Sequence, residues 1–302
     1  MSVNFRAQQA ANKRKTFMLL ALFGALTWLV LFAALTYFGQ STSSIIPIAV
    51  GISLISVWGS YYSSDKLVLT MTGARQIQES ENPKLFGLIQ EVCIASGLPM
   101  PKVAIVEDRA PNAFATGRNP EHALIAFTTG ILEAMDRDEL QGVIAHEMSH
   151  VANRDTLVSA VAATTAGAIA MLSDFIMRML WWGGGRRDSR DNGNNPIALI
   201  GSLIVLILAP IAAMLLQAAI SRRREALADA TAVQFTRNPA GLRSALEVLQ
   251  ADSTVVRHAS NAVAHLYIES PLDSSSVSKL FSTHPPLSER IAILRQMEQG
   301  GI

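Results

Sequence analysis

The residues best suited to chemistry are two histidines and a glutamate in the segment His146–His150, which reads HEMSH. Side chains four residues apart project from the same side of an α-helix, so both imidazoles can reach one cation at about 2.0–2.1 Å. Upstream, Asp136 and Glu139 have the spacing of a capping box, which predicts that a helix begins there. The sequence therefore predicts a zinc-binding helix, the structural context that this pattern requires.

Glu147 gives a second indication of chemistry. It lies on the apolar stripe of the predicted helix, three residues after Ile144 and four before Val151. Burying a carboxylate without a partner costs free energy, so a helix used only for packing would carry an aliphatic residue here. Beside zinc, Glu147 would take the proton of the water that attacks a peptide carbonyl and pass it to the leaving amine. The alternative, two surface histidines around a chance glutamate, explains neither the helix nor the interrupted stripe.

A catalytic zinc ion has three protein ligands and one open position, so a third ligand is needed. The extended metzincin pattern requires Gly at 153 and His at 156, but this chain has Asn153 and Thr156, which argues against that class. Asp155 is a conceivable oxygen ligand, although its place before an apolar run also suits a helix boundary. Glu225 is the stronger candidate, because it begins a helix directly after an apolar run. From the residues alone, the choice between a ligand and an ordinary helix surface at Glu225 stays open.

Further polar residues could support such a site. Asp229 lies one turn after Glu225 and could accept the free ring N–H of a zinc-bound histidine. His284 lies in a proline-rich turn and could donate to a developing oxyanion, which the residues alone leave undecided. Structural or surface roles are expected for the histidines that remain, which are His122, His258 and His265.

Composition points to a membrane protein. Of 302 residues, half are hydrophobic and only 16% are charged, and the mean hydropathy is positive. A soluble domain of this size usually carries more charge. The net charge of +1 gives no indication of a nucleic-acid partner. Cys93 is the one cysteine, which excludes an intramolecular disulfide and a thiolate-rich metal site.

Four apolar runs approach or exceed the length of about 20 residues that crosses a bilayer. They cover residues 16–39, 44–61, 157–182 and 196–220. The first two runs predict one transmembrane hairpin and the last two predict another. Asp174 and Arg178 interrupt the third run, which is therefore either a complete span or a helix partly sheltered by protein.

The basic residues set the expected orientation. The first run is preceded by Arg6, Lys13, Arg14 and Lys15, and the loop after it has no basic residue. Under the positive-inside rule the N-terminus and both soluble regions should be cytoplasmic. Arg222–Arg224 agree with this orientation, whereas the basic residues in the connection at 183–195 oppose it. The expected segments are a cytoplasmic terminus at 1–15, a transmembrane hairpin at 16–61, catalytic-domain parts at 62–156 and 221–302, and a second hairpin at 157–220.

The two soluble regions have different patterns. In 62–156, Pro83 and Gly97 bound a predicted helix, and short apolar runs indicate a small sheet. Its strands are expected at 103–106 and 123–128, with Asn112–Gly117 as an edge strand. Residues 221–302 are predicted to be mainly helical, with a polar break at 270–278.

The order of these elements resembles the HtpX heat-shock protease family, whose members are membrane-bound relatives of the CAAX prenyl endopeptidases. The resemblance covers nearly the whole chain. It is carried by both hairpins, Pro111–Gly117, His146–His150 with Asn153, Glu225–Asp229, and Thr283–Leu287 followed by Glu289 and Arg290.

The resemblance implies an α-helical membrane protein with about four transmembrane helices and an α+β, zincin-like (gluzincin) protease domain. It implies one zinc ion per chain, bound by His146, His150 and Glu225, with Glu147 as the general base. It also implies that Asp229 and Asn153 support the ligands and that His284 and Arg290 contact the substrate or the transition state. An extended polypeptide would pair with the edge strand, whose residues are Asn112, Ala113, Phe114, Ala115 and Thr116.

By the same resemblance, the protein is a multi-pass enzyme of the bacterial inner membrane, with its catalytic domain facing the cytoplasm. Its substrates would be misfolded or damaged membrane and cytoplasmic proteins, degraded in the heat-shock response as quality control. Self-cleavage is a further expectation, at stretches such as Gly183–Asn195. Two alternatives are a processing protease for a defined peptide and a membrane scaffold with structural zinc. A structural site would usually have four protein ligands and would have no need of Glu147.

Overall fold

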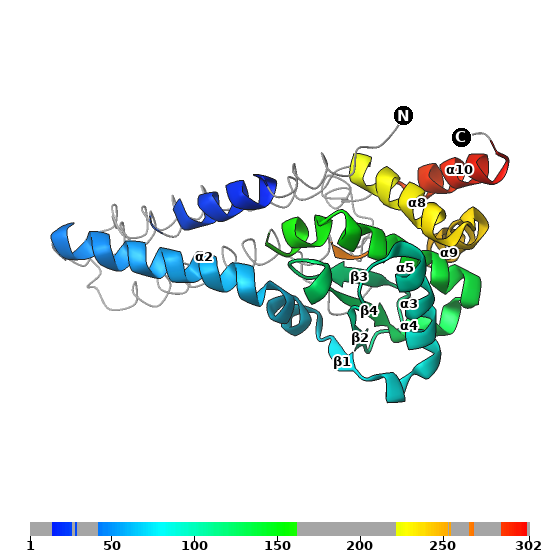
Figure 1. Ribbon diagram of the computed structural model, residues 1–302, viewed down its shortest axis with the longest axis horizontal. Coiled ribbons are helices and arrows are strands. Elements are labelled where there is room, and N and C mark those ends of the chain that lie inside the picture. Colours follow the sequence, from blue (N-terminus) through cyan, green and yellow to red (C-terminus); the bar gives the residue numbers. More distant parts are fainter. Residues whose placement is uncertain are drawn as a thin grey trace, which may run out of the picture.

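The computed structural model describes residues 14–25, 28, 42–161, 222–252, 254, 266–268 and 285–300. The described chain consists of a long helical arm and an α+β body. Figure 1 shows helix α2 (Thr42–Thr72) projecting from the body, with the helix at residues 14–25 alongside it. The two helices are in contact, because a Cβ on Gly24 would lie 3.1 Å from Cγ2 of Val57.

Helix α2 connects an apolar segment directly to the body. Among the described residues it is the one helix long and apolar enough to cross a membrane, over Ile46–Ser63. The helix does not end at residue 61, where the sequence suggests a boundary, but continues to Thr72. Val68 and Thr72 near its end are almost fully buried in the body. A continuous helix therefore leads from the candidate span to the sheet.

The other predicted spans lie largely outside the described residues. The first run is helical at residues 16–25 and 28, and the third run is helical at 157–161. The fourth run, the connection at 183–195 and the polar break at 270–278 are not among the described residues. The two hairpins and their orientation therefore stay predictions.

The body contains a four-stranded sheet with the strand order β1-β2-β4-β3. Strands β2 and β4 are parallel, and the two outer pairs are antiparallel. The strands are β1 (Arg75–Ile77), β2 (Lys102–Val106), β3 (Ala113–Thr116) and β4 (Leu124–Thr128). The position of β3 at the edge confirms the predicted edge strand, and β2 and β4 match the predicted runs. Strand β1 was not predicted, because its three residues include the polar Arg75 and Gln76 and show no apolar alternation.

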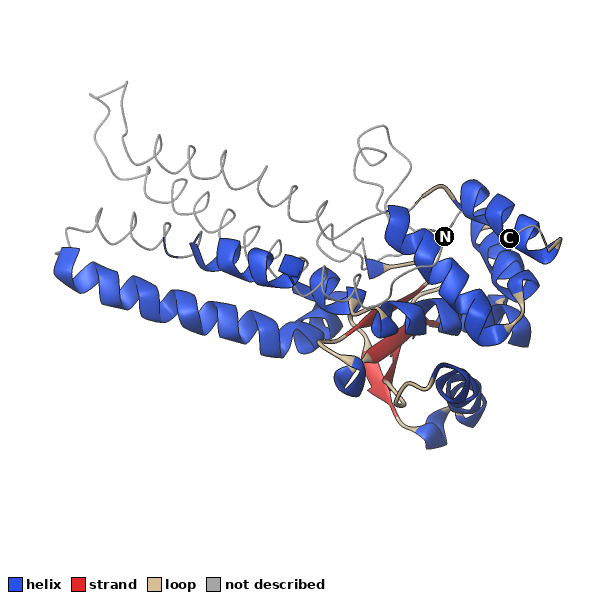
Figure 2. Cartoon of the chain, turned by 45° about the horizontal axis from the view of Figure 1, so that its top comes forward, coloured by secondary structure: helices blue, strands red, loops and turns tan. Residues whose placement is uncertain are grey.

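The sheet buries both faces, since successive side chains along a strand point to opposite sides. On β2, Val103 and Ile105 join a cluster with helices α3 (Pro83–Ser96) and α5 (Arg137–Ala152). Ala104 and Val106 join a cluster on the other face, with the end of α2 and residues 266 and 267. Figure 2 shows the strands surrounded by helices at the base of the arm. The 3-10 turn at Pro120–His122 connects β3 to β4, and the short helix α4 (Thr129–Ala134) follows β4 and precedes α5 in the chain.

Helix α3 has the boundaries that the sequence predicts. The Asn82 side chain accepts a hydrogen bond from the Leu85 N–H, and Pro83 occupies the first helical position. Gly97 ends the helix in the left-handed conformation, with a φ of 70°, and its N–H donates to the Cys93 carbonyl.

Helix α5 begins with the predicted capping box. Asp136 accepts from the N–H groups of Asp138 and Glu139, and the Glu139 carboxylate accepts from the Asp136 N–H. On its other side, α5 packs against α8 (Arg222–Thr236) and α9 (Pro239–Ala251), and α10 (Leu287–Glu298) packs against α9. The crossing of α5 and α9 is close, because a Cβ on Gly142 would lie 2.7 Å from the Leu242 backbone.

Candidate metal centre

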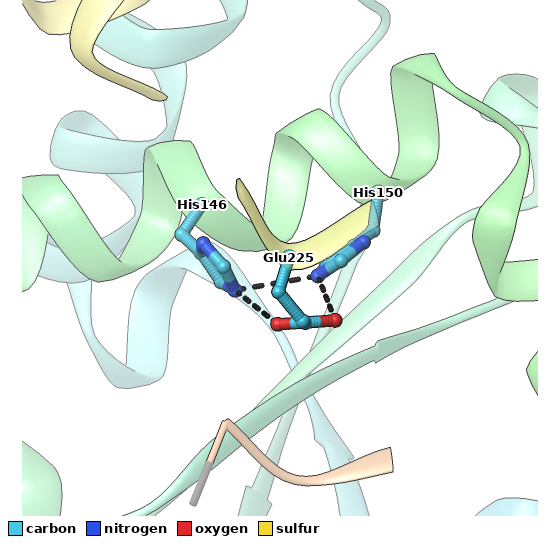
Figure 3. Close-up of side chains that lie close together, drawn as sticks. All are labelled: His146, His150 and Glu225. Atoms are coloured by element: carbon cyan, nitrogen blue, oxygen red, sulfur yellow. Dashed lines mark hydrogen bonds and ion pairs between the residues drawn. The ribbon is translucent and has the colours of Figure 1, made fainter. Parts of the chain in front are cut away.

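The candidate centre is formed where α5 faces the first turn of α8. His146 and His150 lie on α5 and Glu225 lies on α8. Figure 3 shows the three side chains pointing toward one another from these helices. His146 and Glu225 are almost fully buried, and His150 is only slightly exposed. The structure thus brings together the residues that the sequence and the resemblance predict as ligands.

The distances between the candidate ligand atoms suit a metal ion. Nε2 of His146 lies 3.3 Å from Nε2 of His150. Oε2 of Glu225 lies 3.6 Å from the first of these atoms, and Oε1 lies 3.8 Å from the second. A tetrahedral ion with bonds of about 2.0–2.2 Å separates its ligands by about 3.3–3.6 Å. Two imidazole nitrogens and a carboxylate are also the donors that catalytic zinc uses, so the residues fit this ion.

The ring of His146 is held in place by a carboxylate at Nδ1. Its Nδ1 lies 2.9 Å from Oδ1 of Asp229, so Nδ1–H donates to this carboxylate and Nε2 keeps its lone pair. Arg290 of α10 donates to both oxygens of Asp229, from Nε over 2.9 Å and from Nη2 over 2.7 Å. Nη2 is also 3.3 Å from Nδ1 of His146. Arg290 therefore lies against the ligand and its partner, and its Nη1 is buried without a hydrogen-bond partner in the described structure.

The ring of His150 also has a carboxylate partner. Its Nδ1 lies 3.2 Å from Oδ2 of Asp155, which is almost fully buried. The sequence alone suggests either an oxygen ligand or a helix-boundary residue at Asp155. The structure places it at Nδ1, on the side of the ring away from the other ligands. Its position five residues after His150 is the one signal in the sequence that could have suggested this contact.

The electrostatic environments of the two histidines differ. Burial and the nearby Arg290 guanidinium lower the pKa of His146 to about 4. Burial also opposes the charged form of His150, but the carboxylates of Glu225 and Asp155 outweigh it and raise the pKa of His150 to about 9. Burial likewise opposes ionisation of Asp229, yet the Arg290 guanidinium holds the pKa of Asp229 far below its usual range.

Glu147 lies inside the body, as its position on the apolar stripe predicts. It is 2% exposed, and burial raises the pKa of its carboxyl to about 7. The charges that act on it come from His150, Glu225 and Arg290, and its carboxylate accepts a hydrogen bond from the Ala115 N–H of β3. Glu147 therefore connects the ligand group to the edge strand.

The edge strand itself is buried along its length. Asn112 faces β4, where its N–H and carbonyl are bonded to Thr128, so the alternating backbone groups of Ala113 and Ala115 face outward. The Ala113 carbonyl accepts a hydrogen bond from the Ile268 N–H over 2.9 Å. The preceding Tyr267 is fully buried and packs edge-on against Phe114. No pattern in the sequence predicts this contact.

The remaining candidates have different placements. Asn153 is buried and ends α5, where its N–H donates to the Ser149 carbonyl; its support of the ligands stays a prediction. His122 is exposed and lies 2.7 Å from the Asn119 side chain. His258, His265 and His284 lie outside the described residues.

Comparison with known proteins agrees with this geometry. Residues 79–298 match peptidase family M48. The chain is 47% identical over 293 residues to a "Protease HtpX homolog" of Streptococcus gordonii, covering 96% of this chain and 99% of that protein. It is 45% identical over 291 residues to a protein of the same description from Caldanaerobacter subterraneus subsp. tengcongensis, covering 96% of each.

One solved structure has a similar fold. The crystal structure of S. mikatae Ste24p matches with a TM-score of 0.50 and 18% identity, over 95% of this chain and 66% of that one. At this identity the match concerns the fold alone. The sequence relatives confirm the resemblance to the HtpX proteases, and this chain is a metalloendopeptidase that belongs to peptidase family M48.

Proposed function

We propose that this protein is a membrane-integrated, zinc-dependent endopeptidase in which Glu147 is the general base. The observation that carries the proposal is the convergence of His146, His150 and Glu225 beside a buried glutamate and an edge strand. His146, His150 and Glu225 would hold the ion, with donor distances that fit it. A bound zinc ion supplies Lewis acidity, which polarises a carbonyl and makes water a stronger nucleophile.

The protein's own residues handle the proton. Glu147 accepts it from the attacking water and returns it to the nitrogen of the leaving amine. Its buried position excludes bulk water, and its raised pKa brings proton uptake and release close to neutral pH. Positive charge at the ligand group favours the ionised carboxylate, which is the form that acts as a base.

Asp229 and Arg290 are proposed to hold His146 in position. Asp229 fixes the tautomer of His146, and the two hydrogen bonds from Arg290 fix Asp229. This contact supports a positioning role for Arg290. Its buried Nη1, which has no partner in the described structure, could in addition contact a substrate carbonyl. We also propose that His284 stabilises the transition state, and this role rests on the family resemblance alone.

The outer edge of β3 is proposed as the binding site for an extended polypeptide. Backbone groups of Ala113 and Ala115 face outward, and pairing through them would place the substrate next to Glu147. In this structure the Ala113 carbonyl is taken by Ile268 and the Ala115 N–H by Glu147. Substrate binding at both groups would therefore require that these internal bonds be exchanged.

The membrane location and the substrates are proposed from the sequence and from the HtpX relatives. Support in the structure comes from α2, whose apolar segment Ile46–Ser63 leads into the body. We propose four spans, a cytoplasmic catalytic domain in the bacterial inner membrane, and degradation of misfolded or damaged membrane and cytoplasmic proteins under stress. Self-cleavage at segments such as 183–195 would follow from the same activity.

A cleavage assay in detergent tests the proposal. The full chain is purified without metal, and an unfolded test protein is added before and after reconstitution with zinc. Zinc-dependent cleavage at internal peptide bonds is expected. Cleavage that persists in the metal-free chain, or removal of single terminal residues only, would contradict a zinc-dependent endopeptidase.

A further inference from the structure

The turn after α5 brings a second carboxylate to the ligand helix. Asn153 ends α5, and Arg154 follows with a φ of 58°, in the left-handed region that non-glycine residues rarely adopt. The chain then enters the helix at residues 155–161. This reversal places Oδ2 of Asp155 3.2 Å from Nδ1 of His150.

The turn is also fixed to the sheet. The Thr156 hydroxyl donates to the Gly117 carbonyl over 2.9 Å, at the end of β3. Asp155 and Thr156 are both almost fully buried. The Asp155 carboxylate is therefore held in place by packing and is not part of a mobile surface side chain.

Each histidine consequently has a carboxylate partner at Nδ1. His146 has Asp229 at Nδ1, and His150 has Asp155 at Nδ1. In a neutral imidazole whose Nδ1–H donates to a carboxylate, Nε2 carries a lone pair. The two Nε2 atoms lie 3.3 Å apart, so both rings in their neutral form would present lone pairs to one ion. Such carboxylate partners fix the tautomer and ring orientation of a ligating histidine and increase its basicity.

Two other roles for Asp155 agree less well with the geometry. As an oxygen ligand it would have to reach the ion, but it contacts the opposite side of the His150 ring. Among the described residues, the group of three or more side chains whose ligand atoms all lie within 4.8 Å of one another is His146, His150 and Glu225, without Asp155. If Asp155 only stabilised the start of the helix, its charge could interact favourably with the helix dipole from an exposed rotamer. It would then not need to be buried against an imidazole.

We propose that Asp155 is a positioning residue that orients His150 toward the metal ion. The inference deepens the proposed function and rests on His150 being a ligand. Loss of such a partner typically lowers metal affinity by about 10–100-fold. Asp155 acts through His150, so its effect must disappear when His150 is removed.

Zinc itself is the probe, and the readout is zinc affinity of the full chain in detergent, measured by competition with a chromogenic chelator. Asp155→Ala is expected to lower the affinity by about 10–100-fold. Asp155→Asn keeps an acceptor oxygen and should fall between this variant and the wild type. Asp138→Ala changes an exposed acid at the start of α5 and should bind zinc as the wild type does.

One double variant separates positioning from general damage. In a His150→Ala background, Asp155→Ala should cause no additional loss. The proposal is overturned if Asp155→Ala binds zinc as the wild type does, if Asp138→Ala loses as much affinity as Asp155→Ala, or if the loss persists without His150. If His150→Ala alone leaves affinity unchanged, the proposed metal centre fails, and the role of Asp155 fails with it.

Discussion

Arg290 donates hydrogen bonds from Nε and Nη2 to the two carboxylate oxygens of Asp229, over 2.9 and 2.7 Å. Both side chains are almost fully buried, and Asp229 contacts Nδ1 of His146. The last helix of the described chain is thus connected to the ligand helix through one buried ion pair. Bidentate pairs of this kind fix geometry as well as contributing energy.

Replacing Arg290 should therefore damage both stability and the metal site. Arg290→Met leaves the Asp229 carboxylate buried without its cation, which typically costs about 3–5 kcal/mol. The free energy of unfolding can be measured by denaturant titration in detergent, together with zinc content. Arg295→Met is the matched control, since Arg295 lies on the same helix, is 61% exposed and pairs with Glu247. A loss of about 0–1 kcal/mol is expected there, and equal losses in the two variants would contradict the role given to Arg290.

The close crossing of α5 and α9 should tolerate no side chain at Gly142. A Cβ there would lie 2.7 Å from the Leu242 backbone, so Gly142→Ala must push the helices apart, at a cost of about 1–3 kcal/mol. Gly87→Ala is the control, because Gly87 lies within α3 and a Cβ would meet no atom within 4 Å. That change should be neutral or stabilise the helix by up to about 1 kcal/mol. The unfolding temperatures of the two variants test this contact, and similar shifts of the unfolding temperature in both would argue against it.

Removal of the metal should destabilise the protein. A ligand that binds only the folded state stabilises it, by about 4 kcal/mol at a concentration 1,000 times its dissociation constant. Treatment with a chelator is therefore expected to lower the unfolding temperature, and zinc should restore it whereas magnesium should not. Glu225→Ala should show little response to zinc. An unfolding temperature that does not depend on zinc would contradict a bound ion at this site.

The contact between Ile268 and Ala113 should limit access to the edge strand. Ile268→Pro removes the N–H that bonds the Ala113 carbonyl. If substrate pairs there, kcat/KM for an extended peptide should rise by about 2- to 10-fold, the equivalent of one net hydrogen bond. Ile268→Val keeps the amide and should behave as the wild type does. A fall in kcat/KM for the proline variant would show that the contact supports the site instead of competing with substrate.

Local signals made the ligand helix predictable. The spacing of His146 and His150 and the capping box of Asp136 and Glu139 are properties of a single helix, so the sequence contains them completely. The sites of β2, β3 and β4 also follow from short apolar runs between turn residues. Strand β1 was missed because its pairing with β2 depends on tertiary contact more than on its own residues.

Contacts between segments far apart in the sequence were harder to predict. Glu225 could be proposed as a ligand only through the expected hairpin and the family resemblance, because no local pattern relates it to His146. The contact of Asp155 with His150 depends on the left-handed backbone at Arg154, and an arginine gives no sequence signal for that conformation. The bond between Ile268 and Ala113 joins segments far apart in the chain, and no motif marks it.

The most direct test of the catalytic role of Glu147 compares the wild type with Glu147→Gln. Both are purified in detergent, their zinc content is quantified, and cleavage of an unfolded test protein is followed over time. Glutamine keeps the size of the side chain but cannot accept the proton, so cleavage should fall by about 100-fold or more while zinc content stays equal. Equal cleavage by the two proteins at equal zinc content would contradict Glu147 as the general base.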